Sequence, residues 1–302
     1  MKGIKGAEMY TMESLRKKIQ SAEDLYGIVK TMKTLAAVSI RHYEKAVRSV
    51  LEYNKTIERG FVAVLSQGSI DILVRNSKEE EKTAAVVFGS DQGLCGGFND
   101  RIVSYAMDIL YQQDDQKTQK MLLCVGQRAF ALLEQRGHPV ESIFPVPGSL
   151  TGVTSIVQKL VVNLDELQLK QNVSRVIVFH NRLLSTSSYE PNSLRVLPLD
   201  REWYQKRKEI PWESRSLPVF TMKRDRLISA LVKQYVFMSL YRAFVESMAS
   251  ENAGRLSSMQ TAERNIEDTL DDFNALYRNE RQSSITSELI DIVSGYEAIR
   301  SD

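Results

Sequence analysis

The chain has 302 residues, of which 43% are hydrophobic and 26% charged, the proportions of an ordinary soluble protein. Its formal net charge of +2 creates no large single-sign field, so we expect no nucleic-acid partner. The chain contains no run of about 18 apolar residues, so it is not expected to cross a membrane itself. The N-terminal sequence lacks the apolar core of a secretory signal. Composition therefore favours a soluble protein of one or two domains.

The residue types that most often carry chemistry are sparse. Two cysteines, Cys95 and Cys124, are too few for a disulfide framework and indicate a reducing compartment. Three histidines, at His42, His138 and His180, are scattered without metal-ligand spacing. We therefore expect neither a metal nor a cofactor.

The first third of the chain is predicted to form a long helix over residues 12–66. All seven prolines lie between Pro139 and Pro218, so neither end of the chain contains a helix breaker. Thr11 and Ser14 are both candidate N-caps. Apolar or small residues recur every three or four positions and form one stripe along the helix: Leu15, Ile19, Ala22, Tyr26, Val29, Met32, Ala36, Ile40, Tyr43, Val47 and Val50, then Ile57, Phe61 and Val64.

A second long helix is predicted over residues 222–298. Its stripe runs through Leu227, Leu231, Tyr235, Met238, Tyr241, Val245, Met248, Met259, Ala262, Ile266, Leu270, Phe273 and Tyr277, with small residues between 250 and 258. A single long helix is too narrow to bury its own stripe, so the two helices should pair, and the intervening chain makes the pair antiparallel. At 1.5 Å per residue, the second helix is longer than the first and extends about 30 Å past the end of its partner, beyond residue 276. A partner outside this chain should cover that end.

The middle of the chain reads as a separate α/β unit, which gives a three-part division into 1–66, 67–221 and 222–302. Strand–helix alternation predicts a partly parallel, Rossmann-like sheet covered by helices. We expect strands at 83–88, 120–125, 174–180 and 193–198, and helices at 99–112, 127–136 and 154–166. The turn-rich segment STSSYEPN predicts that the last two strands form an antiparallel hairpin.

One motif resembles a chemical site: GSDQGLCGGFND, residues 89–100, directly after the first strand. Glycines between a strand and a helix can hold phosphate at the helix N-terminus, which supports a small nucleotide-using enzyme. The motif has no Lys-Ser/Thr pair, however, and its glycines do not match G-x-G-x-x-G. Cys95 as a nucleophile needs a paired base, and no candidate stands out. A tight structural turn with left-handed glycines is the interpretation we favour.

These segments together resemble the γ family of F-type ATP synthases. The glycine motif is similar to the family's S-D-x-G-L-C-G-x-x-N. The opening SLRKKIQSAEDLYGIVKTMKTLAAV resembles the family's first helix, and residues 246–299, which include ASENAGRLSSM and NERQSSITSELIDIVSG, resemble its last helix almost throughout. The match covers nearly the whole chain and is weakest between 127 and 225.

The resemblance implies a non-catalytic rotor. In that family the paired helices form a shaft inside a hexamer of α and β subunits, and the α/β part forms a foot on the ε subunit and the membrane ring of c subunits. The rotor couples ion flow through the ring to ATP synthesis or hydrolysis in the hexamer. The implied location is peripheral, on the cytoplasmic side of a prokaryotic inner membrane. Two alternatives to the rotor remain: the small nucleotide-using enzyme and a coiled-coil scaffold unrelated to rotation.

The resemblance also implies specific contacts with the hexamer. By motif these are Arg281, Gln282, Thr286 and Glu288 near the end of the last helix, with Arg255 and Met32 at a second level of the shaft. Three segments depart from the family pattern: residues 1–10 precede its usual start, residues 39–47 read SIRHYEKAV, and residues 212–226 lack the usual run before the last helix. These departures are compatible with a divergent γ subunit of an alternative ATPase complex.

Overall fold

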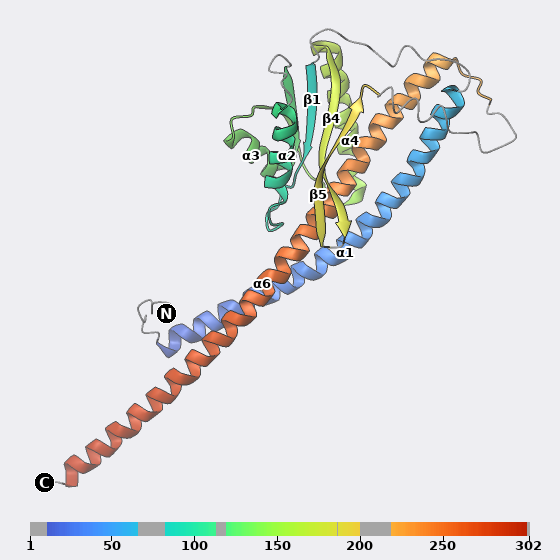
Figure 1. Ribbon diagram of the computed structural model, residues 1–302. Helices are drawn as coiled ribbons and strands as arrows, with labels where there is room; N and C mark the ends of the chain where they lie inside the picture. Colours follow the sequence, from blue (N-terminus) through green and yellow to red (C-terminus); the bar gives the residue numbers. More distant parts are fainter. Residues whose placement is uncertain (1–10, 66–81, 113–118, 186, 200–218, 301–302) are drawn as a thin grey trace. The chain divides into compact units, whose positions relative to one another are not determined.

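The computed structural model describes residues 11–65, 82–112, 119–185, 187–199 and 219–300 (Figure 1). The chain forms two compact units, Ala36–Ser257 and a smaller one made of Met1–Leu35 with Ser258–Asp302. Both long helices contribute to both units, so the three-part division at 66 and 221 remains a prediction. Residues 1–10 and 212–218, in two of the departing segments, lie outside the described residues.

The larger unit contains a five-stranded sheet in the order β3-β2-β1-β4-β5. The strands are β1 (Lys82–Phe88), β2 (Lys120–Val125), β3 (Val140–Phe144), β4 (Val173–Ser185) and β5 (Ser188–Leu197). The pairs among β1 to β4 are parallel, and β5 is antiparallel to β4. The mixed sheet and its closing hairpin confirm the fold class expected from the sequence.

Helices cover both faces of this sheet (Figure 1). One face packs against α2 (Phe98–Gln112) and α3 (Gln127–Gln135), the other against α4 (Leu150–Gln171) and α6 (Arg224–Arg300). Alternate residues of β1 divide between the two cores, with Val86 facing α4 and α6 and Val87 facing α2 and α3. The α/β part therefore lacks a complete core without the C-terminal helix.

Three elements of the α/β part, two in the sheet and one helix, differ from the sequence prediction. Strand β3 was missed because it has only five residues between Pro139 and Pro145, positions that an edge strand tolerates. The hairpin loop was placed at 185–192, but pairing continues from Ser185 to Ser188. Helix α4 extends past the predicted end at 166 and stops where Asn172 adopts a left-handed conformation.

Within the larger unit, α1 (Met12–Leu65) runs antiparallel to α6. The Gln234 amide donates a hydrogen bond to the Tyr53 hydroxyl at 3.1 Å, and the Phe61 and Tyr235 rings meet edge to face. A Cβ on Gly60 would lie 2.9 Å from Leu231. Residue numbers rise on one helix as they fall on the other, as the sequence predicted.

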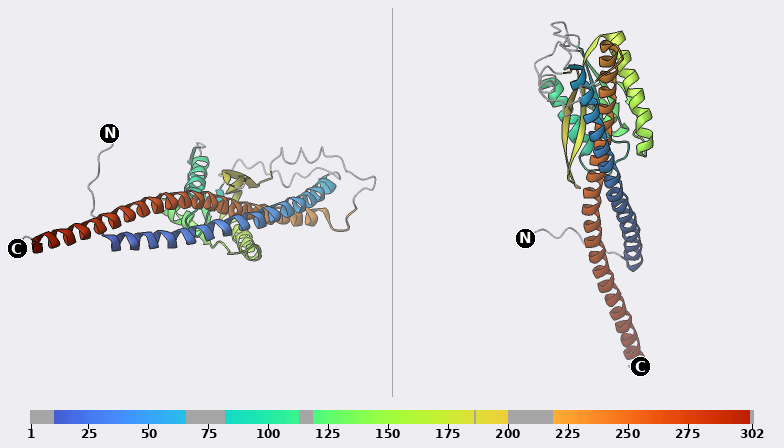
Figure 2. Two further views of the ribbon diagram at one scale, coloured as in Figure 1. Left: turned by 90° about the horizontal axis from the view of Figure 1, so that it is seen from below. Right: turned by 90° about the vertical axis from the view of Figure 1, so that its right-hand side faces the viewer.

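The smaller unit repeats this arrangement between the first part of α1 and the last part of α6 (Figure 2). Lys33 pairs with Glu263, the Tyr26 hydroxyl donates to Glu267 at 3.0 Å, and the Lys18 ammonium lies 5.8 Å from the centre of the Phe273 ring. The Thr11 hydroxyl accepts a hydrogen bond from the Ser14 backbone N–H, so Thr11 is the N-cap of α1. Every described stripe residue of both helices is buried or half-buried.

Beyond residue 280, α6 continues without a partner from the described part of the chain. Its large apolar side chains there are about half exposed or more: Ile285 49%, Leu289 58%, Ile290 58%, Ile292 68%, Val293 55% and Tyr296 66%. Both views in Figure 2 show this end of α6 continuing past the start of α1. The overhang inferred from helix lengths is therefore present.

The antiparallel register predicts a specific crosslink. Cysteines at Ile19 and Leu270 should form a disulfide under mild oxidation, because both side chains are half-buried between the two helices. Non-reducing gel mobility with peptide mass spectrometry measures the product. A cysteine pair at Ile19 and Leu231 serves as the control and should stay reduced, and crosslinking of the control pair instead would contradict the register.

Candidate functional site

The glycine-rich loop after β1 is fixed by its own polar side chains. The Asn99 side chain accepts a hydrogen bond from the Ser90 backbone N–H and donates one to the Ser90 hydroxyl, both at 2.9 Å. The Ser90 hydroxyl in turn donates to the Gln92 carbonyl at 2.8 Å. Ser90 and Asn99 are both buried. Ser90 and Asn99 therefore form hydrogen bonds within the loop itself. A phosphate-binding loop would place hydrogen-bond donors for its ligand at this position.

Asp91 ties the same loop to the neighbouring elements. One carboxylate oxygen accepts the backbone N–H of Gln127 and the other accepts that of Val146, each at 2.8 Å. Gln127 begins α3, so the carboxylate satisfies a donor at a helix N-terminus, where negative charge is stabilising. Gly126 (φ 101) lets the β2–α3 turn approach Ser90. The structure thus assigns Asp91 an architectural role.

The small-residue segment of α6 is where this helix meets the loop. A Cβ built on Gly254 would lie 2.6 Å from the Cys95 carbonyl oxygen and 3.1 Å from the Tyr189 ring. Ala253 is fully buried in the same contact region. Only glycine allows the helix and the loop backbone to come this close. The apparent interruption of the apolar stripe at 250–258 is therefore a packing surface.

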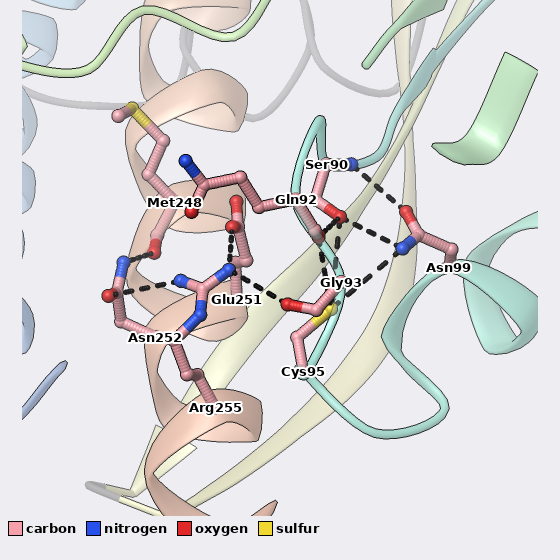
Figure 3. A network of polar contacts seen from close by, with 9 residues as sticks. All are labelled: Ser90, Gln92, Gly93, Cys95, Asn99, Met248, Glu251, Asn252 and Arg255. Atoms are coloured by element: carbon pink, nitrogen blue, oxygen red, sulfur yellow. Dashed lines mark hydrogen bonds and ion pairs between the residues drawn. The ribbon is translucent and has the colours of Figure 1, made fainter. Parts of the chain in front are cut away.

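Arg255 lies at this contact and is itself buried, at 9% exposure. Its guanidinium pairs with Glu251 at 2.6 Å and donates to the Gly93 carbonyl and the Asn252 side chain, each at 3.4 Å (Figure 3). Burial raises the pKa of the Glu251 carboxyl, and the Arg255 guanidinium opposes that rise. Arg255 thus joins α6 to the glycine-rich loop, and its predicted contact with another subunit remains a prediction.

Nine residues earlier, about two and a half turns, α6 carries another buried charged residue, Glu246, at 5% exposure. One of its oxygens lies 2.8 Å from His180 Nε2 of β4, and the other accepts from Arg242 Nε at 2.7 Å. Burial acts to raise the pKa of Glu246, but the hydrogen bond with His180 and the neighbouring Arg242 guanidinium outweigh it, so the pKa is lowered. The sequence analysis did not single out Glu246, although Glu246, Ser250 and Gly254 are spaced by four residues.

The two cysteines are buried thiols. Burial raises the pKa of Cys124 to about 12, and it also raises the pKa of Cys95. The groups within hydrogen-bond reach of the Cys95 sulfur are the Ser90 hydroxyl, the Gln92 carbonyl and the Asn99 amide, none of which is a base. A thiolate nucleophile is therefore disfavoured at this position.

The remaining predicted contacts lie in the smaller unit. Arg281, Gln282, Thr286 and Glu288 are exposed along the overhanging part of α6, where the Thr286 hydroxyl donates to the Gln282 carbonyl at 2.8 Å. Met32 is half-buried on α1. The four α6 residues are thus brought together on one helix, whereas Arg255 belongs to the other unit. Their partner contacts remain predictions.

A double-variant comparison tests the Arg255–Glu251 contact. Arg255→Ala leaves Glu251 buried without its cation, which should lower the free energy of unfolding by about 3–5 kcal/mol. The double variant R255M/E251L replaces both charges with apolar groups and should recover most of that loss. Urea unfolding followed by circular dichroism measures both. Equal losses in the single and double variants would contradict the pairing.

No described helix is both long and apolar enough to cross a membrane. Among the described residues there is also no cluster of three or more His, Cys, Asp or Glu side chains that could hold a metal ion.

Known proteins place the chain in a family. The sequence profile described as ATP synthase matches residues 11–299. The chain is similar to the ATP synthase gamma chain of Dechloromonas aromatica, with 26% identity over 95% of this chain and 99% of that one. It is similarly related to the gamma chain of Glaesserella parasuis, with 27% identity over 95% and 99%.

Solved structures agree at the level of the fold. A rotor chain of the Euglena gracilis mitochondrial ATP synthase superposes with a TM-score of 0.62 at 14% identity and covers 91% of this chain and 98% of that chain. A chain of its OSCP/F1/c-ring assembly gives a TM-score of 0.65 at 16% identity, covering 96% and 95%. The chain therefore belongs to the ATP synthase family, alongside relatives that are γ chains.

Proposed function

We propose that this chain is the γ subunit of an F-type ATP synthase, the central-stalk rotor that couples ion flow through a membrane ring to ATP synthesis or hydrolysis. The observation that carries the proposal is the end of α6, where six large apolar side chains are about half exposed or more. An isolated amphipathic helix is unstable in water unless its apolar side is covered. A surrounding ring of catalytic subunits provides that cover.

The mechanism we propose is a shift of populations among catalytic sites. The tip of α6 is asymmetric, with different side chains around its circumference, so three identical sites around it cannot all make the same contacts. Each orientation of the helix then favours one conformation in each site, and rotation changes which site is favoured. Arg281, Gln282, Thr286 and Glu288 are the proposed contacts with the α and β subunits, and Met32 and Arg255 act at a second level.

The proposal gives the larger unit a separate role from that of the tip of α6. Its α/β part serves as the foot that binds the ε subunit and the ring of c subunits. The chain is then peripheral to the membrane, on the cytoplasmic side of a prokaryotic inner membrane. The bacterial origin of the two γ-chain relatives named above supports that placement.

We further propose that the chain itself is not catalytic and binds no cofactor. The support is the glycine-rich loop, whose Ser90, Asp91 and Asn99 side chains are all engaged within the fold. The loop also lacks the lysine that a P-loop uses to bind phosphate. No observation specifically favours the nucleotide-using enzyme or the non-rotary scaffold.

Replacing two tip residues tests the rotor function. R281A/Q282A should lower ATP hydrolysis or ATP-driven ion pumping in a complex reconstituted with α, β, ε and membrane-ring subunits, because two proposed contacts are lost. The melting temperature of the isolated chain should stay nearly constant, since exposed substitutions usually change stability within about 0.5 kcal/mol. R264A, an exposed arginine on the part of α6 that pairs with α1, is the matched control. Failure of the wild-type chain to bind the hexamer would refute the proposal.

Calorimetry separates the rotor from the enzyme alternative. The purified chain should show no heat of binding with Mg-ATP and no ATP hydrolysis, because the loop lacks a phosphate-binding lysine and its Ser90 and Asn99 side chains are engaged within the fold. Stoichiometric binding that disappears in a Gly97→Val variant would instead support the enzyme. Gly97 is the suitable position, since a Cβ there meets only the Arg101 side chain, at 3.9 Å.

A further inference from the structure

Helix α6 makes polar contacts with strand β4 and with the glycine-rich loop at three positions along its length. Glu246 pairs with His180, the Ser250 hydroxyl donates to the Asn181 carbonyl at 3.0 Å, and Arg255 donates to the Gly93 carbonyl at 3.4 Å. We call Glu246, Ser250 and Arg255 the polar ladder. All three are buried, as is His180 at 2% exposure. The ladder lies entirely within the larger unit.

Apolar packing alone does not fix how a helix sits on a sheet. Burial of apolar area is non-directional, so a helix that slides or rolls to another position can recover most of it. Hydrogen bonds depend on distance and angle, and a buried carboxylate without partners is costly. Each member of the polar ladder therefore penalises displacement of α6 along or around its own axis.

Gly254 adds a steric stop to the same contact. A slip of one helical turn, about 5.4 Å, would bring Ser250 or Ser258 close to the place that Gly254 now occupies. Either side chain would put a Cβ about 2.6 Å from the Cys95 carbonyl oxygen, judged from the Cβ built on Gly254. The same slip would separate the Glu246 carboxylate from His180 and leave it buried. Sterics and charge thus select one register.

We propose that the polar ladder is the torque-bearing junction of this chain, the set of positioning residues that fixes the register of α6 against the α/β part. The torque role rests on the proposed function, because only a rotor must carry load between its foot and its shaft. Under load, a junction held by apolar contacts alone would yield by sliding. Glu246 and Ser250 connect the helix directly to strand β4, through the His180 side chain and the Asn181 carbonyl.

The key variant removes the directional hydrogen bond between two buried side chains but keeps their volume. H180F/E246L replaces the buried pair with apolar side chains of similar size, a change that often preserves stability. Glu246→Gln retains the shape of the side chain and removes the charge, and it decides the question if the double variant does not fold. Glu166→Gln, an exposed carboxylate on α4 that pairs with Lys170, is the matched control.

The first measurement uses the isolated full-length chain. Spin labels at Gln135→Cys on α3 and Lys233→Cys on α6 are exposed and lie in the same unit, whereas the native cysteines are buried. Pulsed electron paramagnetic resonance should give one narrow distance for wild type and E166Q. It should give a broadened or second distance, displaced by up to about 5 Å, for H180F/E246L. A single wild-type distance in H180F/E246L, or in E246Q if the double variant does not fold, would overturn the proposal.

The second measurement uses the reconstituted complex. The number of ions pumped per ATP hydrolysed, measured with protons and with sodium, should fall in H180F/E246L and in E246Q, while E166Q matches wild type. A wild-type ratio in both ladder variants would overturn the torque role. A wild-type chain that does not bind the catalytic subunits would refute the proposed function instead, and the spin-label distance would still decide whether the ladder fixes the register.

Discussion

The fold depends on one constraint: an α-helix is too narrow to bury its own apolar side. Helix α6 meets this constraint with different neighbours along its length. It packs against α1 in both units and against the sheet and α4 in the larger one. Past residue 280 the described chain offers no further neighbour, and the apolar side chains stay exposed. The function we propose follows from these exposed apolar side chains, which a partner outside this chain must cover.

Periodicity in the sequence predicted most of the architecture. The long helices were expected at 12–66 and 222–298 and are found at Met12–Leu65 and Arg224–Arg300, because a stripe repeating every three or four residues over many turns has few alternatives. Strand β3 was missed because five residues between two prolines carry almost no periodic signal. The hairpin was misjudged because Pro191 reads as a loop residue, yet β5 is an edge strand that accommodates it.

The residues of the candidate site and their contacts were harder to predict from the sequence than the fold. Residues such as Arg281 and Gln282 were selected by resemblance, and the structure adds that they are exposed. Arg255 was selected in the same way, but its partner Gly93 is 162 positions away, and no local pattern encodes such a pairing. Burial decides the chemistry of Glu246 and Cys95, and burial depends on the whole fold. The spacing of Glu246, Ser250 and Gly254 was the only local hint.

The shared core also constrains how the protein can be made. Strands β1 and β2 appear early in synthesis, but the face that they turn toward α4 also needs residues 236–249 of α6, which the ribosome produces much later. Until then, an apolar surface of the sheet has no permanent cover, a state that favours aggregation and chaperone binding. Truncation before α6 should therefore remove more than a projecting helix: it leaves the nascent α/β part unable to complete its folding.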